Sequence, residues 1–325
     1  MSAGRRLRAA LLALAMSLVL AACGSGSGQR LSIATGGSGG VYYVFGGGLA
    51  EQISEHLDGY EATAEVTSAS VDNMFLIGDG KSEVAFSLAD TAADAVLGKE
   101  AFAGQPIPAQ ALARLYSNIT QVVTTKGSGI TSVADLRGKR ISTGSPNSGT
   151  EVIARRVLRA AGLDPERDIS AQQLGVGESV QAVKDGALDA FFWSGGVPTG
   201  AVTDLATTEE IVILPTAQYA AALKKQYGEF YLETTIEPGR YKGVTSPVPV
   251  IAVPNYLVVN KSMDPELAYS ITKLLFERKK ELAAVHPSAN RTELATAPRV
   301  APLELHPGAK RYYDEATQQG GPKPQ

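Results

Sequence analysis

Apolar positions near the start of this chain follow two different periods, one after the other. A β-type run covers residues 31–35, and a glycine-rich turn over residues 36–40 follows it. Apolar residues then recur at intervals of four, at Val41, Phe45, Leu49, Ile53 and Leu57. An interval of four keeps apolar side chains on one face of a helix. The pattern predicts a strand over 31–35 and a helix over 41–57.

The same alternation continues as far as Pro215. Further strand-like runs cover 62–67, 83–88, 121–125, 139–143, 189–193 and 211–214. Helical stretches start at Ser70 and cover 90–97 and 148–161, and helix-like sequence precedes the last two strands. A β-rich segment over 248–260, a helix from Pro265 to about His286 and a Pro- and Gly-rich tail over 289–325 close the chain. This order predicts an α/β fold with mostly parallel strands, built as two units, and a tail that wraps the surface or frays.

The N-terminal segment has the pattern of a secretory signal. Arg5, Arg6 and Arg8 precede a short apolar stretch that ends in Leu20-Ala21-Ala22-Cys23, which resembles a bacterial lipobox. Cys23 is the only cysteine of the 325 residues. We predict a signal peptide over 1–22, lipidation of Cys23 and a flexible tether over 23–30. The alternative is an ordinary signal peptide that is cleaved near Ala22.

Composition and charge exclude several classes of function. The formal charge is −3 and no Lys/Arg-rich run is present, so nucleic acid is not an expected partner. The three histidines lack metal-ligand spacing, so we expect no metal and no cofactor. The first turn is not a dinucleotide fingerprint, because Tyr42 replaces its third glycine, and no P-loop occurs. A serine hydrolase would also need a histidine base near its serine, and His56 is expected at the end of a helix while the other two histidines lie in the C-terminal region. We therefore expect a binding protein and not an enzyme.

A second polar turn, Gly144–Thr150, precedes the predicted helix over 148–161. Ser148 and Glu151 have the spacing of a capping box, which makes Ser148 the N-cap. The free amides and the positive dipole end of that helix then lie among Ser145, Ser148, Gly149 and Thr150. The alternative is a well-capped helix that binds nothing.

Three more turns follow predicted strands and supply candidate ligand contacts. The first contains Ser38, Gly39, Gly40 and Tyr42. In the next, Ser68 and Ser70 either donate to a ligand or, for Ser70, only cap a helix. Trp193 and Gly195 follow a later strand, where Trp193 is either a wall of the cleft or a buried packing residue. Ligands of open α/β sheets bind at the carboxyl ends of strands, so the four turns together predict a two-jawed anion clamp.

Several segments, in this order, resemble the TAXI-type solute receptors of TRAP transporters. They are residues 34–43, 67–73, 132–140 with 144–151, 185–190 and 236–241. The resemblance implies a two-lobed, type II periplasmic-binding-protein-like fold that closes on its solute about a hinge. It also implies an extracytoplasmic, monomeric, membrane-anchored receptor. Such a receptor captures a small carboxylate or amino acid, such as glutamate or 2-oxoglutarate, for a TRAP-type membrane permease.

Leu88-Ala89-Asp90 departs from the family pattern, in which Gln-Ser-Asp is frequent. Asp90 is retained and is a candidate ligand contact, whereas the missing amide and hydroxyl predict a more apolar wall. We expect lobe 1 over 31–121 plus 246–325 and lobe 2 over 122–245. The hinge is expected near 121–125 and 248–260. An alternative function is a ligand-sensing accessory lipoprotein that signals to a membrane kinase or another partner.

Overall fold

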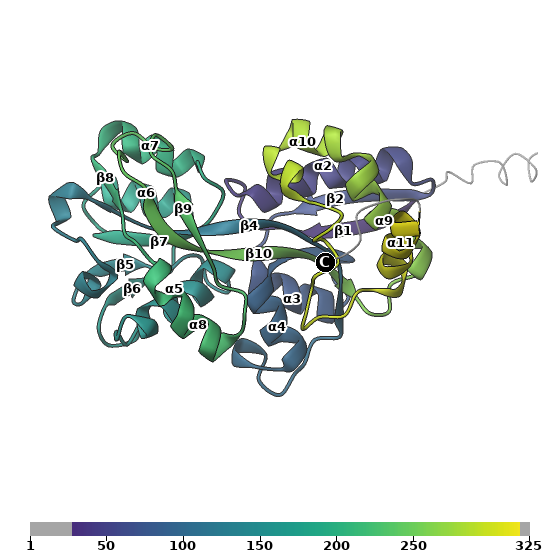
Figure 1. The fold of residues 1–325 in the computed structure, drawn as a ribbon, viewed down its shortest axis with the longest axis horizontal. Coiled ribbons are helices and arrows are strands. Elements are labelled where there is room, and N and C mark those ends of the chain that lie inside the picture. The colour runs from purple at the N-terminus through teal and green to yellow at the C-terminus, as the bar shows by residue number, and fades with distance from the viewer. Residues whose placement is uncertain (1–27, 319–325) are drawn as a thin grey trace, which may run out of the picture.

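The computed structural model describes residues 28–318, and these form one mixed sheet covered by helices (Figure 1). The strands are β1 (Gln29–Ala34), β2 (Tyr60–Glu65), β3 (Val84–Leu88), β4 (Ala109–Thr125), β5 (Arg140–Ser142), β6 (Ser170–Gln172), β7 (Ala190–Gly195), β8 (Ile211–Ile213), β9 (Leu232–Ile236) and β10 (Val248–Asn260). The helices are α2 (Val41–His56), α3 (Ser70–Gly78), α4 (Ala89–Leu97), α5 (Gly149–Ala160), α6 (Val176–Lys184), α7 (Gly200–Thr208), α8 (Ala220–Tyr227), α9 (Pro265–Glu277), α10 (Lys279–Val285) and α11 (Pro307–Gln318).

Two long antiparallel strands, β4 and β10, run through the whole sheet and divide it into two halves (Figure 1). The order of the main path is β2-β1-β3-β10-β4-β7-β5-β6, with β8 on β4 and β9 on β10. The first half contains the parallel strands β1, β2 and β3, and the second contains the parallel strands β5, β6 and β7. The carboxyl ends of both parallel sets meet at the boundary between the halves.

Three apolar clusters hold this arrangement together. One packs α2, α9, α10 and α11 on the sheet of the first half, and another packs α6 and α7 on the second half. The third cluster is shared, because it joins α3 and α4 of the first half to α5 and α8 of the second. Burial of apolar surface therefore stabilises the contact between the halves as well as each half itself.

The elements agree with the sequence pattern where that pattern is local, and differ in several places. β1 begins at Gln29, inside the predicted tether over 23–30, and β6 and α8 are elements that the pattern does not predict. β4 begins at Ala109, twelve residues before the predicted strand, because the extra residues pair with β10. Arg278 interrupts the predicted last helix, which becomes α9 and α10. The tail contains α11, and β9 pairs with the start of β10. α11 packs on α9, whereas β9 and β10 are consecutive strands that pair antiparallel.

The structure does not bear on the predicted signal peptide over 1–22 or on lipidation of Cys23, which lie outside residues 28–318. Within those described residues, none of the helices is long and apolar enough to span a membrane.

Candidate functional site

A cavity of about 600 Å³ lies between the two halves, at the carboxyl ends of the parallel strands. The turn after β1 and the turn before α3 line it from the first half. The turns after β5 and β7 line it from the second half. The sequence-predicted residues that line this cavity are Ser38, Gly39, Gly40, Tyr42, Ser68, Ser70, Ser145, Ser148, Gly149, Thr150, Trp193 and Gly195. All the candidate ligand contacts except Asp90 therefore surround one space.

Six helices begin at the wall of this cavity. They are α2, α3, α4, α5, α6 and α7, and each has its first residue or its N-cap residue in the lining. The first amides of a helix have no partners within that helix, and its N-terminus has a partial positive charge. Among the described lining residues, Glu178 is the one with a charged side chain. An anion in this cavity would therefore meet backbone amides and side-chain hydroxyls, and no lysine or arginine side chain of the described lining.

Ser148 is the N-cap of α5, as the sequence predicts. Its hydroxyl accepts a hydrogen bond from the backbone N–H of Glu151 at 3.1 Å. The reciprocal bond of the predicted capping box differs, because the Glu151 carboxylate accepts from the N–H of Asn147 at 3.0 Å. This bond orders the turn that leads into α5.

Ser70 does not cap α3, whose N-cap is Ala69. The Ser70 hydroxyl instead accepts a hydrogen bond from the N–H of Leu88 at 3.0 Å, which ties α3 to the end of β3. Leu88 itself lines the cavity, whereas Ala89 is buried behind it. An apolar side chain therefore lies in the cavity wall at residue 88.

Trp193 both packs and forms a wall. Its half-buried ring lies in the cavity lining, and its Nε1 donates a hydrogen bond to Thr199 Oγ1 at 2.9 Å. The N–H of Thr199 donates to the hydroxyl of Tyr241 at 2.8 Å, and that hydroxyl donates to Gln121 at 2.7 Å. Tyr241 ends the last of the segments that carry the family resemblance, so that segment acts by bracing the Trp193 wall.

A buried network of polar side chains crosses the floor of the cavity from one half to the other. Tyr42 donates from its hydroxyl to Asn255 on β10, and Asn255 Nδ2 donates to Asn118 Oδ1 on β4 at 3.1 Å. Asn118 Nδ2 in turn donates to the carbonyl of Ser194 on β7 at 3.1 Å. Burial raises the pKa of Tyr42 far above its usual value, so its hydroxyl keeps the proton that it donates.

Asp90 does not line the cavity, which corrects the expectation that it contacts the solute. Its side chain is fully buried and forms an ion pair with Arg156 of α5, at 3.1 Å from Oδ2 to Nη1. The Tyr231 hydroxyl donates to the same carboxylate oxygen at 2.8 Å. A buried carboxylate needs such partners, because leaving it unpaired away from water is costly.

Asn118 and the Leu174–Glu178 turn also line the cavity, and neither is predicted from the sequence pattern. The turn has a usable signal, because Gly175 and Gly177 precede the acidic residue at the start of a helix. Asn118 has none, because it lies inside a strand whose partners are distant in sequence. Within residues 28–318, no group of three or more His, Cys, Asp or Glu side chains is arranged to hold a metal ion.

Two solved structures have this architecture. The first is PhnD1 from Prochlorococcus marinus (MIT 9301) in complex with methylphosphonate. It has a TM-score of 0.55 and 12% identity, and the alignment covers 90% of this chain and 98% of that one. The second is the periplasmic aliphatic sulphonate binding protein SsuA from Escherichia coli, with a TM-score of 0.50 and 14% identity, covering 89% and 84%.

At these identities the likeness is one of fold, and it confirms the expected type II periplasmic binding protein architecture. Of these two proteins, SsuA is named as a binding protein. The family model of the NMT1-like family matches residues 33–317, which include every element that lines the cavity. The chain belongs to the NMT1-like family.

Proposed function

We propose that this protein is an extracytoplasmic solute-binding protein that captures a small anionic solute, of the carboxylate class, for a membrane transporter. The observation that carries the proposal is the convergence of six helix N-termini on one cavity of about 600 Å³. Hydroxyls of Ser38, Ser68, Ser145 and Thr150 lie in the same lining. Partial positive charge and hydrogen-bond donors suit a carboxylate without a full counter-charge.

The segments that resemble TAXI receptors support a TRAP-type permease as the transporter. The residues of these segments at 34–43, 67–73 and 144–151 line or border the cavity. In this proposal lobe 1 comprises 31–121 plus 246–325, lobe 2 comprises 122–245, and closure about β4 and β10 encloses the solute. Lipidation of Cys23 is proposed as the anchor, and mass spectrometry of the mature N-terminus tests it.

Isothermal titration calorimetry against a panel of solutes tests the proposed ligand class. The panel contains L-glutamate, 2-oxoglutarate, a short monocarboxylate, methylphosphonate, an alkanesulphonate and a neutral sugar. We expect saturable heat with at least one carboxylate. Binding of the neutral sugar, with no heat from any carboxylate, would overturn the carboxylate class.

A matched pair of variants links the heat to the cavity. Ser145→Ala removes a hydroxyl from the lining, whereas Ser132→Ala removes one from a short helix that is remote from the lining. We expect Ser145→Ala to raise the Kd for the bound carboxylate by about tenfold, the equivalent of one hydrogen bond to a charged group. Equal affinities in the two variants would place the binding outside this cavity.

A further inference from the structure

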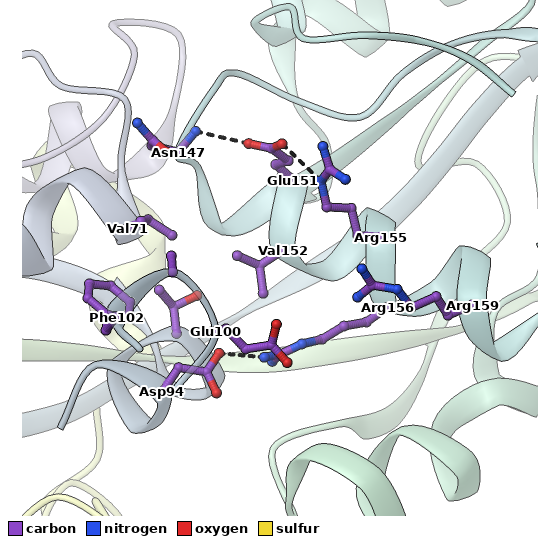
Figure 2. A pocket seen from close by; sticks show the side chains of 12 residues that line it. Val71, Asp94, Glu100, Phe102, Asn147, Glu151, Val152, Arg155, Arg156 and Arg159 are labelled. Carbon is purple, nitrogen blue, oxygen red and sulfur yellow. Dashed lines mark hydrogen bonds and ion pairs between the residues drawn. The ribbon is translucent and has the colours of Figure 1, made fainter. Parts of the chain in front are cut away.

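Helix α5 faces the cavity at one end and contacts the other half of the molecule along its length. Its first residues, Gly149 and Thr150, line the cavity. About two turns further on, Arg156 leaves the same helix and reaches α4 of the first half (Figure 2). A movement between the halves must therefore move the cavity wall and this arginine together.

The contact of Arg156 with the first half is an almost fully buried ion pair. Its side chain is 2% exposed, and its guanidinium meets the carboxylates of Asp90 and Asp94. Within the second half, the Tyr231 hydroxyl accepts from Nη1 at 2.8 Å, and the guanidinium lies over the Tyr227 ring at 4.2 Å. Two tyrosines of the second half thus hold Arg156 in place, and its guanidinium points at two carboxylates of the first half.

Two other contacts between the halves lie on the same side of the cavity. The carbonyl of Asn147, just before α5, accepts hydrogen bonds from the N–H groups of Val71 and Asp72 at 3.1 and 3.3 Å. Gly149 lies so close to the first half that a Cβ there would be 2.7 Å from the Ser70 hydroxyl. All of these contacts join α5 to α3 and α4 in the relative position of the halves that the structure has.

From this arrangement we propose that Arg156 is a positioning residue for solute capture. Its pairing with Asp90 and Asp94 holds α5 against the first half, so that the N-terminus of α5 stays at the cavity and the closed form is populated even without solute. The inference rests on the proposed function, since it says how that site is kept closed. The charge pair is more specific than the shared apolar cluster, because it is satisfied in only one relative position of the halves.

The fluorescence of Trp193 can measure closure, because Trp193 is the only tryptophan and lies at the boundary of the halves. Its ring is close to the first half, as a Cβ on Gly40 would be 3.7 Å from Trp193 Cη2. Opening would expose this ring to a small quencher. Acrylamide quenching of its fluorescence therefore reports closure in the absence of any solute.

The experiment compares the wild type with Arg156→Lys, Arg156→Gln and the control Arg155→Gln. Arg155 is the adjacent residue of α5 and pairs with Glu151 and Glu166 in its own half. We expect about a twofold higher Stern–Volmer constant for Arg156→Gln, a smaller increase for Arg156→Lys and the wild-type value for Arg155→Gln. If Arg156→Gln does not fold, Arg156→Lys carries the test, because it retains the charge.

Wild-type quenching in a folded Arg156→Lys protein whose melting temperature is lowered would overturn the proposal, because Arg156 would then be a structural residue only. Equal rises in the Arg155 and Arg156 variants would overturn it as well. The test needs no ligand, so failure of the calorimetric panel and failure of this inference are separate results. For any solute that the panel identifies, the dissociation rate of the Arg156→Lys complex is expected to rise by about tenfold with an unchanged association rate.

Discussion

The backbone of Gly149 lies directly against the side chain of Leu88, on the opposite half of the molecule. A Cβ at residue 149 would be 2.5 Å from Leu88 Cδ1, a separation that non-bonded carbon atoms do not adopt. The conformation of Gly149 is helical, so the glycine is required by this contact and not by its φ angle. The two residues thus limit how closely the halves approach.

Gly149→Ala is expected to weaken closure. An added methyl group in a packed contact costs about 1–3 kcal/mol, and here part of that cost is avoided if the halves separate. We expect a lower melting temperature and higher acrylamide quenching of Trp193. Gly127→Ala is the control, because a Cβ there meets nothing within 4 Å.

Leu88→Ala in the Gly149→Ala background is expected to restore closure in part, because it removes the Leu88 carbon atoms that the new methyl group meets and leaves the Ser70 hydroxyl at 2.7 Å. The quenching of the double variant should return toward the wild-type value. If Leu88→Ala instead adds to the effect of Gly149→Ala, the contact between these residues is not what limits closure.

The Asn118→Ala variant is expected to destabilise the protein by about 1–3 kcal/mol, because it removes two buried hydrogen bonds. One N–H of Asn255 Nδ2 loses its acceptor, while its bond to the carbonyl of Tyr116 remains, and the carbonyl of Ser194 loses the Asn118 donor. Urea unfolding measures the loss. Gln110→Ala is the control on the same strand, since the bond of Gln110 to Glu304 is exposed. A loss below about 0.5 kcal/mol for Asn118→Ala would mean that the network adds little to stability.

Ser148→Ala removes the cap of α5 and is expected to lower the free energy of unfolding by about 1 kcal/mol. Ser148→Thr keeps the hydroxyl, so its free energy of unfolding is expected to fall much less. The physical reason is the bond from the N–H of Glu151, which only a side-chain oxygen at residue 148 can accept. Thermal unfolding of the three proteins measures the difference. Equal melting temperatures for the Ala and Thr variants would contradict the capping role.

Stability is expected to respond to pH through Asp94. Burial raises its pKa to about 6, an effect larger than the opposing one of Arg156, and Asp90 and Glu100 raise it further. The folded state therefore holds this proton more tightly than the unfolded chain does, so ionisation of Asp94 reduces stability as the pH rises toward and through about 6. The neutral side chain of Asp94→Asn escapes this penalty.

Because Asp94→Asn also removes a carboxylate from the Arg156 pair, the prediction concerns the trend: the melting temperature of Asp94→Asn minus that of the wild type is expected to rise as the pH increases from 5 to 8. Asp79→Asn is the control, because Asp79 pairs with Lys81 at the surface. A difference that is constant between pH 5 and 8 would show that Asp94 does not titrate in this range.

Sequence reasoning succeeded for features whose partners are close along the chain. The cap of α5 lies within four residues, from Ser148 to Glu151, so residue types and spacing were sufficient to predict it. The strand–turn–helix junctions were likewise predicted from local periodicity, and they determine which turns lie at the carboxyl ends of the parallel strands. For these reasons almost all the predicted contact residues surround one cavity.

The tertiary structure decided the interactions between residues that are far apart in sequence. Asp90 has the spacing of a site residue, but a guanidinium 66 positions away pairs with it and keeps it out of the cavity. The first part of β4 lacks a clear strand pattern and becomes a strand because β10 supplies its hydrogen bonds. Short-range patterns fix helix ends and turns, because those depend on backbone groups a few residues away. The partner of a buried charge or of an unpaired strand edge depends on which distant segment the fold brings beside it.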